Sequence, residues 1–253
     1  MSSYDEYSRR YRNIAFERRG AVVQIRLHTD GGVLQWGSNE GSVHGQLCDA
    51  FRDLAHDASL RAVILTGTGD RFCTELSATE NARSLTAADW SRLMREGREL
   101  LADFLAIEVP IIAAVNGPVH IHSELPVLAD IVLASETAEF ADRVHFAYGV
   151  VPGDGVHVVW PQLLGVNRAR HFLLTGQAIG AQQAQALGVV AEVLAPGALQ
   201  ARAWEIAAQL EQKPVVALRN TTLALRRALR RALNEDLDVG LALEGLGLLS
   251  FRD

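Results

Sequence analysis

The pattern of apolar and polar residues predicts three strands in the first half of the chain. Residues 22–27 alternate between apolar and polar side chains, which is typical of a strand with one exposed face. Residues 62–67 and 111–115 are largely apolar, and short continuous runs of this kind indicate strands that are buried on both faces.

A helix is predicted between the second and third strands, from about Ala87 to Leu105. Thr86 precedes it as an N-cap, and Asp89 follows three positions later, as in a capping box. A strand, a helix and a further strand in succession require a crossover connection, which places the helix on a sheet face and functional loops at strand ends. The expected fold class is therefore α/β.

The loops after the two buried strands span residues 66–73 and 116–122. Gly67 and Gly69 in the first loop match neither the Walker nor the dinucleotide-binding spacing. We therefore predict a tight turn there and no phosphate cradle.

The second half of the chain is predicted to be mainly helical. Apolar residues recur at helical spacing in three runs, each followed by a glycine: residues 158–164, 168–174 and 181–187. Residues 199–249 continue the helical pattern, with a break at Pro214. We expect a core of residues 1–198 and a C-terminal helical region of residues 199–253.

Composition narrows the class of partner. The chain has 253 residues, 49% of them hydrophobic and 21% charged, which is enough for one substantial core. Its formal net charge of −6 disfavours nucleic acid and membrane surfaces as partners, because both require concentrated positive charge. A small-molecule partner is favoured.

The cysteines and the N-terminus favour a cytoplasmic protein. Cys48 and Cys73 show neither a CxxC spacing nor a disulfide framework, so no zinc site or disulfide is predicted. Residues 1–19 are polar and lack the apolar stretch of a secretory signal, and no apolar run is long enough to cross a bilayer.

The densest positive charge lies in residues 226–231, where two arginine pairs flank Ala228 and Leu229. A phosphate or RNA contact is one interpretation. The arginines fall at helical spacing beside leucines, however, and we favour a solvated helix face or a subunit interface.

His145 and Asp154 bracket a turn rich in glycine, residues 149–155, and are the main candidates for chemistry. An imidazole that takes a proton and a carboxylate that orients it are sufficient to activate water near neutral pH. Without context such a pair is more often a surface pair or a structural cap, so the surrounding motifs decide.

Those motifs resemble the crotonase (enoyl-CoA hydratase/isomerase) superfamily. They occur in order along the chain at residues 62–69, 72–73, 110–117, 149–153, 175–179 and 188–193. The resemblance implies a spiral of stacked ββα units, a C-terminal helical region for trimerisation, and an oxyanion hole of two backbone N–H groups. Such a hole stabilises charge that develops on a substrate carbonyl oxygen.

The chain departs from the common hydratase pattern at residues 74–77 and 120–123. Hydratases of this type also carry glutamates near the positions of Leu125 and His145, and we expect both to be missing here. Loss of both carboxylates argues against ordinary hydration of a thioester.

The substitutions are similar to those of the CoA-independent β-diketone hydrolases of the superfamily, 6-oxocamphor hydrolase among them. The resemblance implies five catalytic residues: His145, Asp154, His122, His44 and Glu244. It also implies a tryptophan near Trp36 that lines the pocket, although the loop of residues 37–43 looks lengthened. The individual alternatives are a polar residue early in a helix for His44, an exposed helical carboxylate for Glu244 and a loop hydrogen-bonder for His122.

The expected chemistry is a retro-Claisen cleavage of a cyclic or bicyclic β-diketone without metal or organic cofactor. His145, oriented by Asp154, would deprotonate water, and His122 with backbone N–H groups near Leu76 and His122 would polarise the carbonyls. The enolate would be reprotonated by His145 or by a His44–Glu244 pair. The side chains expected to shape the pocket are aromatic or apolar: Trp36, Phe72, Leu76, Trp90, Phe146 and Tyr148.

Two other functions compete with this hypothesis. A CoA-thioester hydratase or isomerase with relocated catalytic residues would need basic partners for the CoA phosphates, such as Arg71 or residues 226–231; His122 and Glu75, where small residues are usual, argue against it. A crotonase-fold module for assembly or RNA binding would depend on the arginine-rich helix alone. The resemblance further implies a homotrimer or a dimer of trimers.

Overall fold

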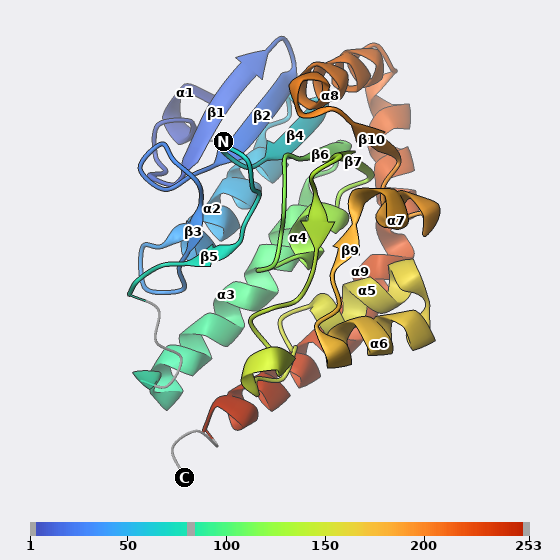
Figure 1. Cartoon of the computed structure of the whole chain (residues 1–253). Coiled ribbons are helices and arrows are strands. Elements are labelled where there is room, and N and C mark those ends of the chain that lie inside the picture. Colours follow the sequence, from blue (N-terminus) through green and yellow to red (C-terminus); the bar gives the residue numbers. More distant parts are fainter. Residues whose placement is uncertain (1–3, 80–83, 250–253) are drawn as a thin grey trace.

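The computed structural model describes residues 4–79 and 84–249 and is built around a six-stranded sheet in the order β1-β2-β4-β6-β7-β10 (Figure 1). The strands are β1 (Ile14–Arg19), β2 (Val22–Leu27), β4 (Ala62–Thr66), β6 (Ile111–Val115), β7 (Ile131–Ser135) and β10 (Glu192–Leu194). Strand β1 pairs with β2 in antiparallel orientation, and every other neighbouring pair is parallel. The predicted α/β class and its two buried strands are confirmed.

Helices cover both faces of the sheet (Figure 1). The larger core contains α2 (Val43–His56) and α3 (Ala87–Ala106), which pack against one face. Helix α8 (Pro196–Glu211) covers the other face with a smaller apolar cluster. Parallel sheets are typically covered on both faces in this way.

The prediction that residues 22–27 form a half-exposed strand was wrong. Only Arg26 is exposed, and Gln24 is 5% exposed. The physical reason is α8, which packs on this side of the sheet and takes Val22 into the smaller core. Alternation of side chains shows two faces, but it does not show that the second face is covered.

The helix expected from about Ala87 is α3, and its capping box is confirmed. The backbone N–H of Asp89 donates to Thr86 Oγ1 at 3.2 Å, and that of Thr86 donates to Asp89 Oδ2 at 2.8 Å. The three predicted runs in the second half are also helices: α5 (Val156–Leu164), α6 (Val166–Thr175) and α7 (Ala181–Ala186).

Short elements complete the described chain. They are α1 (Tyr4–Tyr7), α4 (Glu124–Val127), a 3₁₀ turn (Phe146–Tyr148), and two small sheets formed by β3 (Gln35–Trp36) with β5 (Glu75–Leu76) and β8 (Glu139–Phe140) with β9 (Ile179–Gly180). The β3–β5 pair matters for function, because it places Trp36 beside Leu76 at the mouth of the site.

Helix α9 (Val215–Leu249) is 35 residues long and runs beside α3 and α5 (Figure 1). The expectation that its arginines all face solvent or a subunit was wrong for Arg226, which is 4% exposed. Its guanidinium donates to Asp130 Oδ1 at 2.8 Å and to the carbonyl of Ile107 at 2.6 Å. Arg226 therefore fixes the helix to the core.

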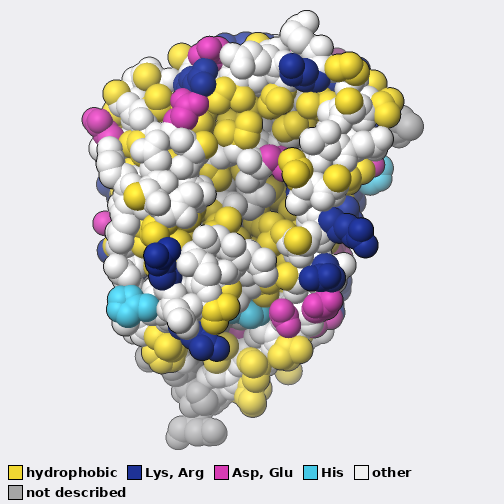
Figure 2. All heavy atoms as spheres, turned by 90° about the vertical axis from the view of Figure 1, so that its right-hand side faces the viewer, with side chains coloured by type: hydrophobic (Ala, Val, Ile, Leu, Met, Phe, Trp, Pro, Cys, Tyr) yellow, Lys and Arg dark blue, Asp and Glu magenta, His cyan; other side chains and the backbone are white. Residues whose placement is uncertain are grey.

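Figure 2 shows the face formed by α6, α7, α8 and the first part of α9, where hydrophobic side chains gather around a hollow. Exposed apolar residues on these helices include Val166, Leu174, Val216 and Leu225. Apolar surface of this kind is typical of contacts with another chain, and the trimer remains a prediction. Among the described helices, none combines the length and the apolarity that crossing a bilayer demands.

Candidate active site

A partly open cavity of about 200 Å³ lies between α3, α9 and the loops at the ends of the strands. It holds most of the residues that the sequence suggested, although they come from segments far apart in the sequence. Its lining includes Trp36, His44, Leu76, Trp90, Ile121, His122, Val144, His145, Val150, Asp154, Leu241 and Glu244.

His145 is the best-connected side chain in this cavity and is only 5% exposed. Its Nδ1 lies 2.7 Å from Asp142 Oδ1, and its Nε2 lies 3.3 Å from Asp154 Oδ2 and 3.7 Å from Glu244 Oε1. The structure thus brings His145 and Asp154 together as expected. Asp142 was not among the predicted residues. It lies three positions before His145 in the sequence and orients the imidazole ring through Nδ1.

Glu244 reaches the cavity because α9 makes an unusually close backbone contact with the turn that carries Asp154. A Cβ added to Gly153 would lie 2.1 Å from the Gly240 carbonyl oxygen, and one added to Gly240 would lie 2.1 Å from the ring of His157. Only glycine fits at both positions. The contact places Glu244, one turn further along the helix, beside Asp154.

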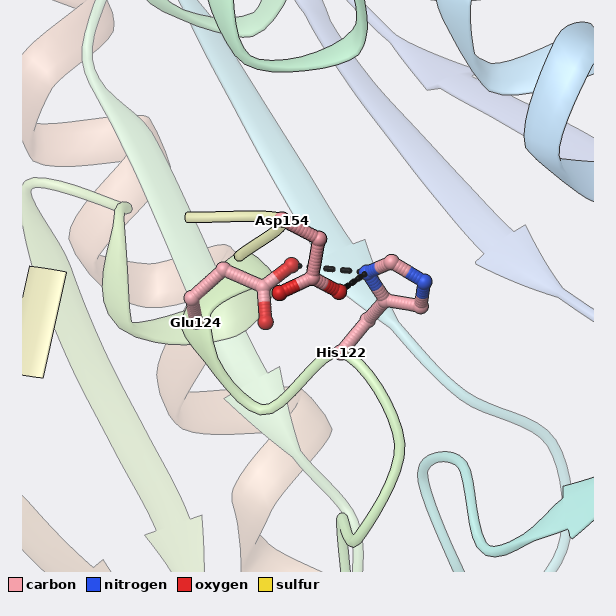
Figure 3. Close-up of side chains that lie close together, drawn as sticks. All are labelled: His122, Glu124 and Asp154. Atoms are coloured by element: carbon pink, nitrogen blue, oxygen red, sulfur yellow. Dashed lines mark hydrogen bonds and ion pairs between the residues drawn. The ribbon is translucent and has the colours of Figure 1, made fainter. Parts of the chain in front are cut away.

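His122 faces two buried carboxyl groups on the Nδ1 side of its ring (Figure 3). Its Nδ1 is 2.8 Å from Glu124 Oε1 and 3.2 Å from Asp154 Oδ2, and its Nε2 points away from both. Its φ of 49° is in the left-handed region, which histidine tolerates better than most residues. Such strained positions concentrate at functional sites.

The backbone N–H groups of the same turn differ in their contacts. The N–H groups of His120 and Ile121 both donate to the carbonyl of Cys73, at 2.8 and 3.3 Å. Within the described ranges, 4–79 and 84–249, no hydrogen bond from the backbone N–H of His122 is seen.

The expectation that the region of Leu125 lacks a carboxylate was wrong. Glu124 stands one position earlier, is fully buried and contacts His122. The four-residue helix α4 begins at Glu124 and turns its side chain inward. The sequence Ser123-Glu124-Leu125 contains this glutamate, but it lies one position before the one at which a glutamate was expected.

Trp36 lies in the cavity despite the lengthened loop that follows it. Its ring packs on His122 with centroids 4.0 Å apart and contacts His44 edge-on at 5.8 Å.

The expected His44–Glu244 pair was wrong, because His44 Nδ1 instead lies 3.1 Å from Glu96 Oε2 on α3. Packing of α2 against α3, which no local pattern shows, decides this partner.

Some of the residues predicted to contact the substrate line the cavity and others do not. Leu76 and Trp90 line the cavity. The expectation for the other aromatics was wrong: Phe72 is 1% exposed within the apolar core, whereas Phe146 and Tyr148 are 50% and 72% exposed on the 3₁₀ turn. The loop after β4 folds inward and the turn after His145 folds outward, so neither faces the cavity.

The charges around the two imidazoles raise their pKa values. Burial disfavours the charged form of His145, but the charge of Asp154 and hydrogen bonds to Asp142 and Asp154 outweigh it and hold the pKa well above its usual range. Burial likewise opposes protonation of His122, but Glu124 and Asp154 outweigh it and raise its pKa. Relative to the expectation of an imidazole poised near neutrality, these contacts favour the protonated form of His145.

The same contacts shift the pKa values of the carboxyl groups in opposite directions. Burial, and then the charge of Asp154, raise the pKa of Glu244 to about 8 and also raise that of Glu124. Burial opposes ionisation of Asp154 too, but the charges of His145 and His122 hold its pKa far below its usual range. Asp154 is therefore the anion that both imidazoles share.

His122, Glu124 and Asp154 could also hold a metal ion. Each offers one donor atom, and these atoms lie within 4.8 Å of one another. Nitrogen and carboxylate oxygen are ligands that Zn²⁺ accepts. The N···O separations of 2.8 and 3.2 Å are hydrogen-bond distances, however, and a shared proton accounts for them.

Comparison with known proteins places the chain in a family. The family model for enoyl-CoA hydratase/isomerase matches residues 40–244. A short-chain-enoyl-CoA hydratase from Clostridium acetobutylicum is 28% identical over 92% of this chain and 86% of its own. An enoyl-CoA hydratase/isomerase structure from Mycobacterium paratuberculosis superposes with a TM-score of 0.86 at 30% identity over 94% of both chains.

A β-diketone hydrolase from the cyanobacterium Anabaena is more similar. Its structure, bound to (S)-3-oxocyclohexyl acetic acid, has a TM-score of 0.93 and 42% identity over 98% of both chains. The crotonase-like fold expected from the sequence is confirmed by these neighbours. The chain therefore belongs to the enoyl-CoA hydratase/isomerase, or crotonase, family.

Proposed function

We propose that this protein is a CoA-independent hydrolase that cleaves a carbon–carbon bond of a cyclic β-diketone. The observation that carries the proposal is His145, a buried side chain held between Asp142 and Asp154 at 2.7 and 3.3 Å in the partly open cavity. An imidazole with two carboxylate partners is suited to activate water. Similarity to the Anabaena β-diketone hydrolase supports the same chemistry.

Water activation is the first step. Neutral His145 takes a proton from water through Nε2, and the oxygen attacks one ketone carbon. Asp154 stabilises the imidazolium that forms, because its carboxylate lies 3.3 Å away. Since the pKa of His145 is raised, the neutral base becomes available as the pH rises above neutrality.

Charge on the substrate oxygens develops next. We assign the backbone N–H of His122 and the Nε2–H of its imidazolium, which is turned away from the two acids in Figure 3, as donors to the substrate oxygens; a donor placed this way contributes roughly 3 kcal/mol. The tetrahedral intermediate collapses by breaking the bond between the attacked carbon and the central carbon. One half of the ring becomes a carboxylic acid, and the electron pair leaves as an enolate.

Protonation of the enolate carbon completes the reaction. Glu244, whose pKa is about 8, carries a proton at neutral pH and lies 3.7 Å from His145 Nε2. Glu244 can donate that proton to carbon and recover it from the imidazolium of His145. The net reaction adds one water to the diketone and yields a keto acid.

The second candidate is a hydratase or isomerase that acts on an acyl-CoA. The hydratases among the relatives and the buried Glu124 favour it. Against it, none of the described residues that line the cavity is lysine or arginine. Two of the proposed phosphate partners are also engaged, because Arg71 pairs with Asp70 and Glu75, and Arg226 is buried.

One experiment separates the two. Purified protein is incubated with a panel of cyclic 1,3-diketones and with crotonyl-CoA, and the loss of each chromophore is followed. We expect diketone cleavage that the His145→Ala variant lacks, and no change in crotonyl-CoA. Turnover of crotonyl-CoA alone would reject the diketone assignment.

A further inference from the structure

Glu124 is a buried acid for which the reaction outlined above has no use. Its side chain is 0% exposed, and Oε1 lies 2.8 Å from His122 Nδ1. Its other oxygen, Oε2, has no hydrogen-bond partner among the described residues; neither does Oδ1 or Oδ2 of Asp154, although Oδ2 makes ion pairs with His122 and His145. Buried polar atoms without partners require an explanation.

The two carboxyl groups approach the same nitrogen. Figure 3 shows Glu124 and Asp154 facing each other on the Nδ1 side of His122, with distances to Nδ1 of 2.8 and 3.2 Å. One N–H cannot offset two full negative charges away from water, so two carboxylates in such a site hold a proton between them.

The geometry decides which of the two keeps the proton. Asp154 also lies 3.3 Å from His145 Nε2, whereas Glu124 has no described cationic partner besides His122. The anion is therefore stabilised on Asp154 by two imidazoles. The pKa directions agree: burial and then Asp154 raise that of Glu124, and the two histidines outweigh burial to lower that of Asp154.

We propose that Glu124 is a positioning residue that stays protonated during turnover. Its carbonyl oxygen accepts the Nδ1–H of His122, and its hydroxyl donates to the free oxygen of Asp154. The ring of His122 is thereby fixed against Trp36, 4.0 Å away, with Nε2 turned from the acids toward the substrate. This inference rests on the proposed diketone hydrolysis for its kinetic test only.

Glutamine is the isostere that tests the protonation state. Glu124→Gln keeps an oxygen that accepts from His122 and an N–H that donates to Asp154, so it resembles the acid and not the anion. Glu124→Ala removes both contacts. We expect kcat with a 1,3-diketone to fall about 100-fold in Glu124→Ala, a loss typical of a mispositioned group. In Glu124→Gln, kcat should lie within about fivefold of wild type, a difference no larger than the net contribution of one neutral hydrogen bond.

The shape of the pH profile should match wild type in Glu124→Gln, because no ionisation is lost. Glu139→Gln is the matched control, since Glu139 makes the same 2.8 Å contact to His120 outside the cavity. It should retain wild-type kinetics. A glutamine variant as impaired as the alanine variant would overturn the proposal, because an ionised Glu124 would then be required.

A second measurement requires neither a substrate nor the alanine variant, so it can be made even if Glu124→Ala does not fold. Nitrogen-15 NMR of labelled histidine follows the titration of His122 in wild type and in Glu124→Gln. An unchanged pKa supports a neutral Glu124, and a fall by about one unit or more, as removal of a neighbouring charge gives, refutes it. The result stands even if no diketone is cleaved, in which case only the proposed function fails.

Metal analysis of the purified wild type tests the alternative that a metal ion, held by His122, Glu124 and Asp154, offsets the two carboxylates. We expect substoichiometric Zn²⁺ and other divalent ions, with activity that survives treatment with a chelator. A stoichiometric ion that Glu124→Gln releases would overturn the proposal, because a cation and not a proton would then offset the two carboxylates.

Discussion

Replacement of Asp154 by asparagine tests the central charge of the proposed site. The carboxylate lies 3.3 Å from His145 Nε2, and Coulomb's law with an effective dielectric constant of about 20 gives roughly 5 kcal/mol for a full charge pair at that distance. Asp142 remains on the other nitrogen at 2.7 Å and limits the loss. We expect the pKa of His145 to fall by about two units, equivalent to about 2.7 kcal/mol.

The rate should fall by about 100-fold to 1,000-fold, because the imidazolium formed during water attack loses its stabilising anion. Initial rates of diketone loss are measured from pH 6 to about pH 10. The rising limb should move to lower pH while the maximal rate drops.

Asp53→Asn is the control for Asp154→Asn. Asp53 accepts hydrogen bonds from Arg10 and Tyr11 far from the cavity, so its removal should leave the profile intact. Circular dichroism checks that both variants are folded. If Asp154→Asn had the maximal rate of wild type and the same rising limb in its pH profile, the assignment of His145 as base and Asp154 as its partner would be refuted.

Three further predictions concern the same architecture. The pH profile of kcat/KM in wild type should be bell-shaped, rising as His145 loses its proton and falling above about pH 8 as Glu244 loses its own; a flat profile over this range would contradict both roles. Gly240→Ala should separate α9 from the turn below it, lowering the melting temperature in a thermal scan and abolishing diketone cleavage, whereas a fully active variant would show that the close contact is dispensable. Arg226→Met should cost about 3–5 kcal/mol in chemical denaturation, because Asp130 is left with an unpaired charge, and a loss below about 1 kcal/mol would show that the pair is not structural.

Much of the fold could be predicted because local signals determine it. The capping box of Thr86 and Asp89 sets the start of α3, and the apolar run from Ile111 to Val115 makes a strand buried on both faces. His145 and Asp154 could be predicted as partners because one continuous turn joins them, so the distance between them depends on a few backbone angles.

The rest of the site depends on contacts between distant segments. His44 pairs with Glu96 because α2 lies against α3, and Phe72 enters the core because its loop folds under the sheet. No periodicity within either segment contains this information. Asp142 and Glu124 were within reach of the sequence, since each stands within three residues of a predicted histidine, but a carboxylate acquires a role only when burial removes its water.

Burial also explains why so many acids can gather around two imidazoles. Four carboxyl groups from three separate segments approach His145 and His122 at 2.7–3.7 Å, and they could not all be ionised there without large electrostatic cost. Protons on Glu124 and Glu244 remove that cost and leave Asp154 as the anion between the rings. Because the contact of Gly240 on α9 with the turn at Gly153 brings Glu244 into the cavity, the C-terminal helix supplies the acid that we propose protonates the enolate. Docking of that helix therefore completes the catalytic site as well as the fold.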